Sequence, residues 1–145
     1  MAYYTCNVII GAIATVSPMA VLRVGAYAVN IRFITYYNTS STAGGIGWGL
    51  KGAGTTTPSA SQLFTPLDSR KPASVDNIDT AWSATPVIPP TWLGRVPVPN
   101  VNGAGNVFSY QKDGPLVLDP AAQLAFFNWT AAATGTGMLS IELEL

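Results

Sequence analysis

The last part of the chain carries the clearest alternation of apolar and polar positions. From residue 139 to residue 145 every second position is Leu or Ile, and Ser or Glu stands between them. Because successive side chains of a strand point to opposite faces, this pattern predicts a strand with one buried and one solvated face. Two more strands are expected just before it, at 116–118 and 124–129. Three strands so close together predict an antiparallel all-β fold.

The first third of the chain predicts four more strands. They are expected at 3–14, 19–24, 27–37 and 46–50. In the third of these, the odd positions are mostly large and apolar, which predicts a half-buried central strand with a mixed outer face. Arg32 on that outer face either points outward or pairs with an acidic group of a neighbouring subunit.

Glycines mark one face of the strand expected at 46–50. Gly47 and Gly49 alternate there with larger apolar residues. Glycine on one face of a strand is typical of a place where a bulky group comes close. We expect a large ring from an adjacent strand, such as Tyr36 or Tyr37, to cover that face.

The section from about 53 to 106 has a different character, because it holds eight of the 11 prolines and little sustained alternation. We expect long ordered loops there, stiffened by proline, with short strands near 63–67, 80–82 and 92–98. A strand at 107–110 follows. No internal repeat and no linker divides the chain, so residues 1–145 are predicted to form a single antiparallel domain.

The composition favours a protein that packs against other subunits. Charged residues make up only 10%, against about 25% in ordinary soluble domains. The alternative is an ordinary β domain covered in Ser, Thr and Asn. The net charge is zero and no basic stripe is present, so we expect no nucleic-acid partner. The apolar run 8–16 is interrupted by Ser17-Pro18, short of the roughly 20 residues of a membrane helix, so we expect no membrane span.

Residues for catalysis and metal binding are scarce. The chain has no histidine, which removes the commonest general base and the commonest metal ligand. Its one cysteine, Cys6, lies in an alternating apolar run and is expected to be a buried hydrophobe. We therefore predict no catalytic residue, no metal site and no cofactor, and we do not expect an enzyme.

Two motifs are interpreted as coincidental or structural. Residues 47–52 match G-x-G-x-x-G, but no convincing helix start follows, and phosphate binding needs one. Asp76 and Asp79, with Asp68 nearby, are expected to be solvated loop carboxylates, because no calcium-loop pattern surrounds them.

A pair of glutamates and two glycosylation triplets are also interpreted as structural or coincidental. Glu142 and Glu144 share one strand face and are interpreted as a solvated row that discourages edge pairing. Asn38 and Asn128 begin glycosylation triplets that are expected to be coincidences.

The four tryptophans divide into two pairs. Trp48 and Trp129 fall on expected strands and are interpreted as core residues. Trp82 and Trp92 lie in the proline-rich section, where an aromatic side chain can anchor a protein interface or a sugar. Core packing under a loop is the alternative for this second pair.

The order of these segments resembles that of a known class of proteins. The resemblance covers about half of the chain and lies in residues 25–38, 46–50, 114–120, 124–129 and the closing strand. They are similar in order to small jelly-roll structural proteins of tailed bacteriophages, the class that includes capsid cement or decoration proteins. The resemblance implies a tumour-necrosis-factor-like jelly-roll β-sandwich of about eight antiparallel strands. It also implies a homo-oligomer that is commonly a trimer on the three-fold axes of the head, and no catalytic residues.

We therefore expect a virion structural protein on the capsid surface that stabilises the head by bridging major capsid proteins. The expected contact residues are Tyr3 and Tyr4 in a short N-terminal arm at 1–5, and Trp82 and Trp92 in the loop section. The alternative function is a carbohydrate- or receptor-binding jelly-roll module of a tail appendage.

Overall fold

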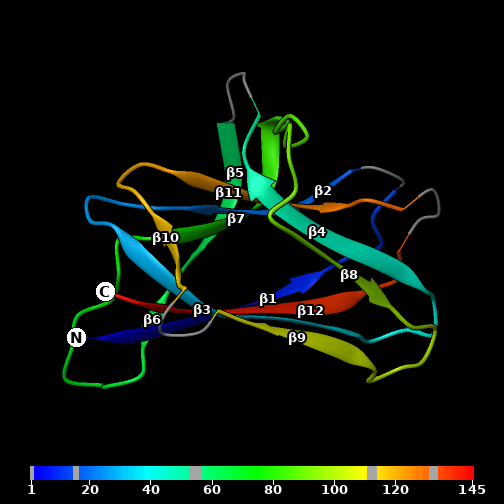
Figure 1. Cartoon of the computed structure of the whole chain (residues 1–145), viewed down its shortest axis with the longest axis horizontal. Coiled ribbons are helices and arrows are strands. Elements are labelled where there is room, and N and C mark those ends of the chain that lie inside the picture. The colour runs from blue at the N-terminus through cyan, green and yellow to red at the C-terminus, as the bar shows by residue number, and fades with distance from the viewer. Residues whose placement is uncertain (1, 15–16, 53–56, 111–113, 131–133) are drawn as a thin grey trace.

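The protein is an all-β sandwich. The computed structural model describes residues 2–14, 17–52, 57–110, 114–130 and 134–145, which form twelve strands and no helix. The strands make two antiparallel sheets of six strands each, one above the other, with both chain ends at the same end of the molecule (Figure 1). The all-β expectation is confirmed, with more strands than the eight or so expected.

The two sheets are named here sheet A and sheet B. Sheet A has the order β10 (Leu116–Leu118), β3 (Val29–Asn38), β12 (Gly137–Glu144), β1 (Tyr3–Ile10) and β6 (Thr65–Pro66), and β9 (Gly105–Ser109) also pairs with β3. Sheet B has the order β5 (Thr57–Leu63), β7 (Asn77–Ala84), β2 (Pro18–Arg23), β11 (Gln123–Asn128), β4 (Gly44–Leu50) and β8 (Gly94–Val98).

Four of the antiparallel pairs are nested in the sequence. The first strand pairs with the last, β2 pairs with β11, β3 pairs with β10, and β4 pairs with β8. Two further ladders, β3 with β12 and β4 with β11, join these pairs side by side. The chain therefore folds as one long hairpin rolled into two layers, and β5, β6 and β7 are inserted between β4 and β8.

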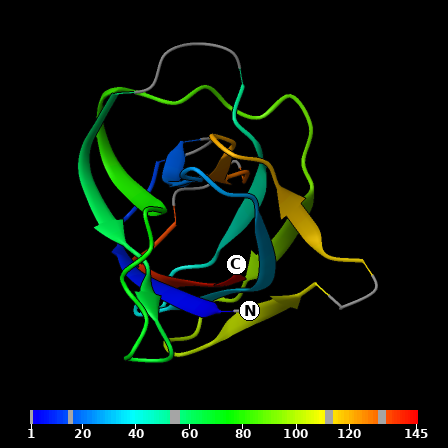
Figure 2. The ribbon, with the colours of Figure 1, turned by 90° about the vertical axis from the view of Figure 1, so that its left-hand side faces the viewer.

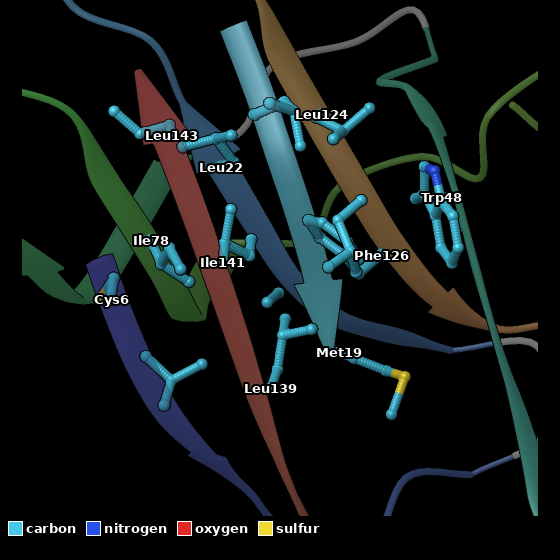
Figure 3. Packing of buried hydrophobic residues seen from close by; sticks show 14 of the residues in the cluster. Cys6, Met19, Leu22, Trp48, Ile78, Leu124, Phe126, Leu139, Ile141 and Leu143 are labelled. Carbon is cyan, nitrogen blue, oxygen red and sulfur yellow. The ribbon is translucent and has the colours of Figure 1, made fainter. Parts of the chain in front are cut away.

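The core lies between the sheets and is built by the alternation that the sequence displays. In β12 the odd positions Leu139, Ile141 and Leu143 are fully buried, as predicted. They face Leu22, Phe126 and other side chains of sheet B (Figure 3). Each such side chain contributes about 1.5–3 kcal/mol on burial.

Two other core predictions are confirmed at the sides of this layer. Cys6 of β1 is buried, and burial raises the pKa of its thiol to about 11. Trp48 of β4 is buried as well, and its Nε1 donates a hydrogen bond to the hydroxyl of Tyr110 at 3.0 Å. The indole is thus placed by a polar contact as well as by packing.

Strand β3 changes its buried face halfway along. Val29 and Ile31 are buried as expected, but beyond them the even-numbered Ile34 and Tyr36 face the core. The register opposite β12 shifts at this point, where Arg32 is an extra residue. A bulge of one residue turns every following side chain to the other face, so the expected outer face was wrong for the second half of the strand.

The proline-rich section is more regular than expected. It contains all of β5, β6, β7 and β8 and the start of β9, and residues 53–56 lie outside the described residues. Phe64, between β5 and β6, is fully buried where the chain passes from sheet B to sheet A. The expected strands near 63–67, 80–82 and 92–98 correspond to β5–β6, β7 and β8.

The N-terminal arm expected at 1–5 is not an arm in its described part. Residues 3–5 begin β1, which pairs with β12 on one side and with β6 on the other at Tyr4 and Thr5. Tyr4 is only 5% exposed. Main-chain hydrogen bonds also join Ala2 and Leu145 in both directions. Met1 lies outside the described residues. The physical reason is that Tyr4 continues the inward row of Cys6, so its burial holds the segment in the sheet.

Candidate functional site

The outer face of sheet B is covered by the chain itself. Residues 85–93, called the strap here, leave β7, pass over β2, β11 and β4, and reach β8 at the far edge (Figure 2). Pro86 and Pro89 of the strap are buried and Trp92 is half-buried. These three positions repeat every third residue, the period of a polyproline II helix, so one side of the strap packs on the sheet.

The glycines of β4 make room for the strap. A Cβ added to Gly47 would lie 2.9 Å from Cε3 of Trp92, and one added to Gly49 would meet Pro89 at 2.8 Å. A large ring does cover Gly47, but it belongs to Trp92, so the expectation of Tyr36 or Tyr37 was wrong. Tyr36 faces the core between the sheets instead.

Trp82 and Trp92 pack against a small cluster under the strap. Val21, Ala125 and Phe127 form this cluster, and the rings of Trp92 and Phe127 meet edge to face with centroids 6.3 Å apart. Trp92 therefore fixes the strap to sheet B, and Trp82 of β7 packs on the same cluster, which is the alternative of core packing under a loop. A role for them in a subunit interface stays a prediction.

Trp129 lies on the same side of the molecule. It follows β11, is half-buried, and stands over Gly45, with the guanidinium of Arg95 5.3 Å from its ring centre. It is thus part of the cover of sheet B rather than of the core between the sheets.

The outer face of sheet A has no such cover among the described residues. We call it the open face and define it by the outward side chains of β1, β12, β3 and β9. Ile9 on this face is 77% exposed and Val107 is 65% exposed. The full set is Tyr3, Thr5, Asn7, Ile9, Asn30, Arg32, Phe33, Thr35, Tyr37, Val107, Ser109, Met138, Ser140, Glu142 and Glu144.

One end of the open face is apolar. Ile9, Met138, Tyr37 and Gly105 stand side by side on four neighbouring strands. The hydroxyl of Tyr37 donates to Sδ of Met138 at 2.9 Å. Because Gly105 has no side chain, the row is low and flat at its β9 end.

The other end of the open face carries an ion pair. Nη1 of Arg32 donates to Oε2 of Glu144 at 2.9 Å, and its guanidinium lies 5.5 Å from the ring centre of Tyr3. The hydrogen bond with Glu144 raises the pKa of Arg32. Arg32 thus points outward, which is one of the two alternatives expected, and its acidic partner is Glu144 of its own chain rather than a group of a neighbouring subunit.

Glu142 stands between these two ends. Its cross-strand neighbours are Thr5 on β1 and Phe33 on β3. No ion pair of its carboxylate occurs among the described residues. The interpretation of Glu142 and Glu144 as a row that protects an edge was wrong, because β12 lies in the middle of sheet A, between β3 and β1.

Proline marks three of the strands at sheet edges. Pro58 lies in β5, Pro66 in β6 and Pro97 in β8. Proline cannot donate to a ladder, so it blocks the addition of a further strand. The flat open face is therefore better suited to a contact with another protein than these edges are.

Asp76 and Asp79 are buried, so the expectation of solvated loop carboxylates was wrong for both. Asp79 lies in β7, accepts two hydrogen bonds of 3.1 Å from Arg23, and is 1% exposed. Asp76 accepts a hydrogen bond from the main-chain nitrogen of Gly25 at 2.7 Å and another from Ser74. Both carboxylates hold loops and strands together, and of these three aspartates only Asp68 is a surface carboxylate, paired with Arg70.

The two glycosylation triplets also have structural roles. The side-chain nitrogen of Asn38 donates to the carbonyl oxygen of Thr42 at 3.2 Å, and that of Asn128 donates to Ala14 at 3.1 Å. Both asparagines are buried. Their side chains are therefore inaccessible in the folded domain.

One pocket among the described residues is small and apolar. It has a volume of about 220 Å³ and lies beside Tyr4, Tyr27, Pro72, Val75 and Leu145. Ligand pockets usually measure about 300–1,000 Å³. Within the described ranges, no group of three or more His, Cys, Asp or Glu side chains is placed to hold a metal, and no helix is long and apolar enough to cross a membrane.

The open face was missed by the sequence reasoning, although a weak signal for it exists. Ile9 is an apolar residue at a position where the alternation along the strand predicts a solvent-facing side chain, between the inward-facing Val8 and Ile10. No family model matches this chain, and no curated protein and no solved structure matches it either.

Proposed function

We propose that the protein is a non-enzymatic structural protein that adheres to other protein subunits, of the kind found as cement proteins on the heads of tailed bacteriophages. Its open face is the contact surface, and its place is the capsid surface, where it bridges major capsid proteins. Several copies, as a homo-oligomer, act together. The following observations support this proposal.

The strand order supports a jelly roll. Nested pairs of first with last, second with next-to-last and so on are what a rolled-up hairpin of eight strands produces. We infer that β1, β2, β3, β4, β8, β10, β11 and β12 are these eight strands. The inserted β5–β7 and the strap then account for the proline-rich section, which lies outside the resemblance to capsid cement proteins.

The difference between the two outer faces carries the proposal. The protein covers the apolar outer face of sheet B with its own strap, and it leaves Ile9 and Val107 exposed on sheet A. A contiguous row of outward apolar side chains, as Ile9, Met138 and Tyr37 form here, is typical of a protein contact. Because the chain covers the outer face of sheet B and leaves that of sheet A exposed, we infer that the exposed face is a contact surface.

The size of the open face suits many weak contacts. Four strands at about 4.8 Å spacing and about seven residues at 3.4 Å give roughly 450 Å². A standard stable interface buries about 800 Å² on each partner. One open face therefore binds weakly, and stable attachment to a shell requires several contacts at once.

The experiment measures binding to phage heads prepared without this protein. The purified chain is added back, and the bound amount is measured by co-sedimentation and by electron cryo-microscopy. The test variant is Ile9→Thr combined with Val107→Thr, which keeps β-branched side chains and removes apolar surface. We expect it to fold normally and to bind about ten-fold more weakly, because two partly buried apolar groups are lost.

The matched control is Val75→Thr combined with Val87→Thr, which changes two exposed valines outside the open face. It is expected to bind like the unchanged chain. Failure of the unchanged chain to bind heads would contradict the proposed function, as would its location on the tail. Equal binding of the two double variants would contradict the assignment of the open face.

We do not propose the alternative of a carbohydrate-binding module. It was based on Trp82 and Trp92, and both rings pack against the cluster on sheet B.

A further inference from the structure

Glu142, near the middle of the open face, has no ion pair among the described residues. Its neighbours across the strands are Thr5 and Phe33, neither of which carries a charge. The nearby acid, Glu144, is neutralised by Arg32 at 2.9 Å. The described part of the open face therefore has one net negative charge, and Glu142 carries it.

Any protein that covers the open face removes the Glu142 carboxylate from water. Removing a carboxylate from water is costly unless a positive group pairs with it. The cost is several kcal/mol per ion even in real proteins, more than two small apolar contacts can offset. A cation opposite Glu142 therefore favours a tight contact, and an apolar surface opposite it disfavours one.

A second copy of this chain cannot supply that cation from its own open face. Arg32 is the only basic residue among the described residues of that face, and Glu144 already holds it. Packing two open faces together would bury two uncompensated carboxylates in one small contact. The partner is thus a different surface, and its charge is opposite.

We infer that the open face docks on a protein surface with one Arg or Lys side chain opposite Glu142, surrounded by apolar side chains that meet Ile9 and Val107. This inference rests on the proposed function and adds the chemistry of the partner. The basic side chain sets the position of the contact, and the apolar surroundings exclude water from the pair.

The test uses the same heads lacking this protein and the variant Glu142→Gln. Glutamine keeps the shape of the side chain and removes the charge, so a partner cation would be left unpaired. We expect binding to weaken by at least about 30-fold. We also expect salt to weaken the binding of the unchanged chain more than that of the variant.

Asp119→Asn is the matched control, because it removes the same charge from an exposed turn after β10. It should bind like the unchanged chain. Thermal unfolding of all three proteins checks that Glu142→Gln still folds, and the salt dependence of the unchanged chain gives an independent reading.

The direction of the change decides the outcome. If the partner is neutral opposite Glu142, the variant binds equally or more tightly, and the inference is overturned while the proposed function stands. If the unchanged chain instead self-associates in solution, and Ile9→Thr combined with Val107→Thr abolishes that association, the open face meets a second copy and the inference is also overturned. If the unchanged chain does not bind heads at all, the proposed function itself fails.

Discussion

The strap can be tested through the contact of Trp92 with Gly47. A methyl group on Gly47 would lie 2.9 Å from Cε3 and 3.0 Å from Cζ3 of the Trp92 ring, closer than normal packing allows. Gly47→Ala should therefore displace the ring from sheet B. Overpacking of this kind costs about 1–3 kcal/mol.

The variant Trp92→Ala removes the ring and its edge contact with Phe127. Truncation of a core Trp costs about 3–5 kcal/mol, and we expect about 2–3 kcal/mol here because Trp92 is only half-buried. In this background the added methyl group of Gly47→Ala has no ring to meet, and its remaining close neighbour is Cγ of the flexible Arg95 side chain at 3.0 Å. It should then be neutral or stabilising by up to about 1 kcal/mol, because alanine loses less backbone entropy than glycine.

The assay is a double-mutant cycle measured by urea unfolding and far-ultraviolet circular dichroism, which does not depend on tryptophan fluorescence. We expect a coupling free energy of about 1–3 kcal/mol between the two sites. Gly114→Ala is the control, because an added Cβ there meets nothing within 4 Å. An equal cost of Gly47→Ala with and without Trp92 would refute the packing of the strap on β4.

Two further predictions concern buried ionisable groups. The pKa of the Cys6 thiol rises from 9.0 to about 11 in the folded state, so the unfolded chain loses this proton first and stability present below pH 9 is lost as the pH rises to 11. The loss in the free energy of unfolding is about 2–3 kcal/mol. Urea unfolding at pH 8 and pH 10.5 should show a smaller decline of this free energy for Cys6→Ala than for the unchanged chain. Parallel declines of the two proteins would contradict the burial of the thiol. Asp79→Asn should destabilise the domain by about 2–3 kcal/mol, because Arg23 loses its buried counter-charge. Asp68→Asn, in the exposed pair with Arg70, should leave the unfolding transition unchanged, and equal effects of the two variants would show that the burial of Asp79 is unimportant.

Local alternation of apolar and polar residues correctly predicted a strand and its buried face where the strand has one solvent-exposed face and no bulge. It located β12 within two residues and identified its buried row, because the period of two is a property of each strand alone. It failed in the second half of β3, where a bulge opposite β12 reverses the faces. A bulge depends on the partner strand, which local spacing does not contain.

The candidate site shows the same division. The glycines of β4 signalled that something bulky comes close, but Trp92 lies more than forty residues away in sequence, and only the path of the strap brings it there. Likewise, Asp76 and Asp79 look like ordinary loop acids until Gly25 and Arg23 are placed beside them.

The amino-acid sequence by itself determined that this chain is an all-β protein poor in charge, because strand periodicity and composition are local properties. Only the tertiary structure decided which outer face is covered and which is left open, because that depends on where a proline-rich segment crosses a sheet. The exposure of Ile9 and the isolation of Glu142 both follow from the order of strands in space, which no single stretch of the chain encodes.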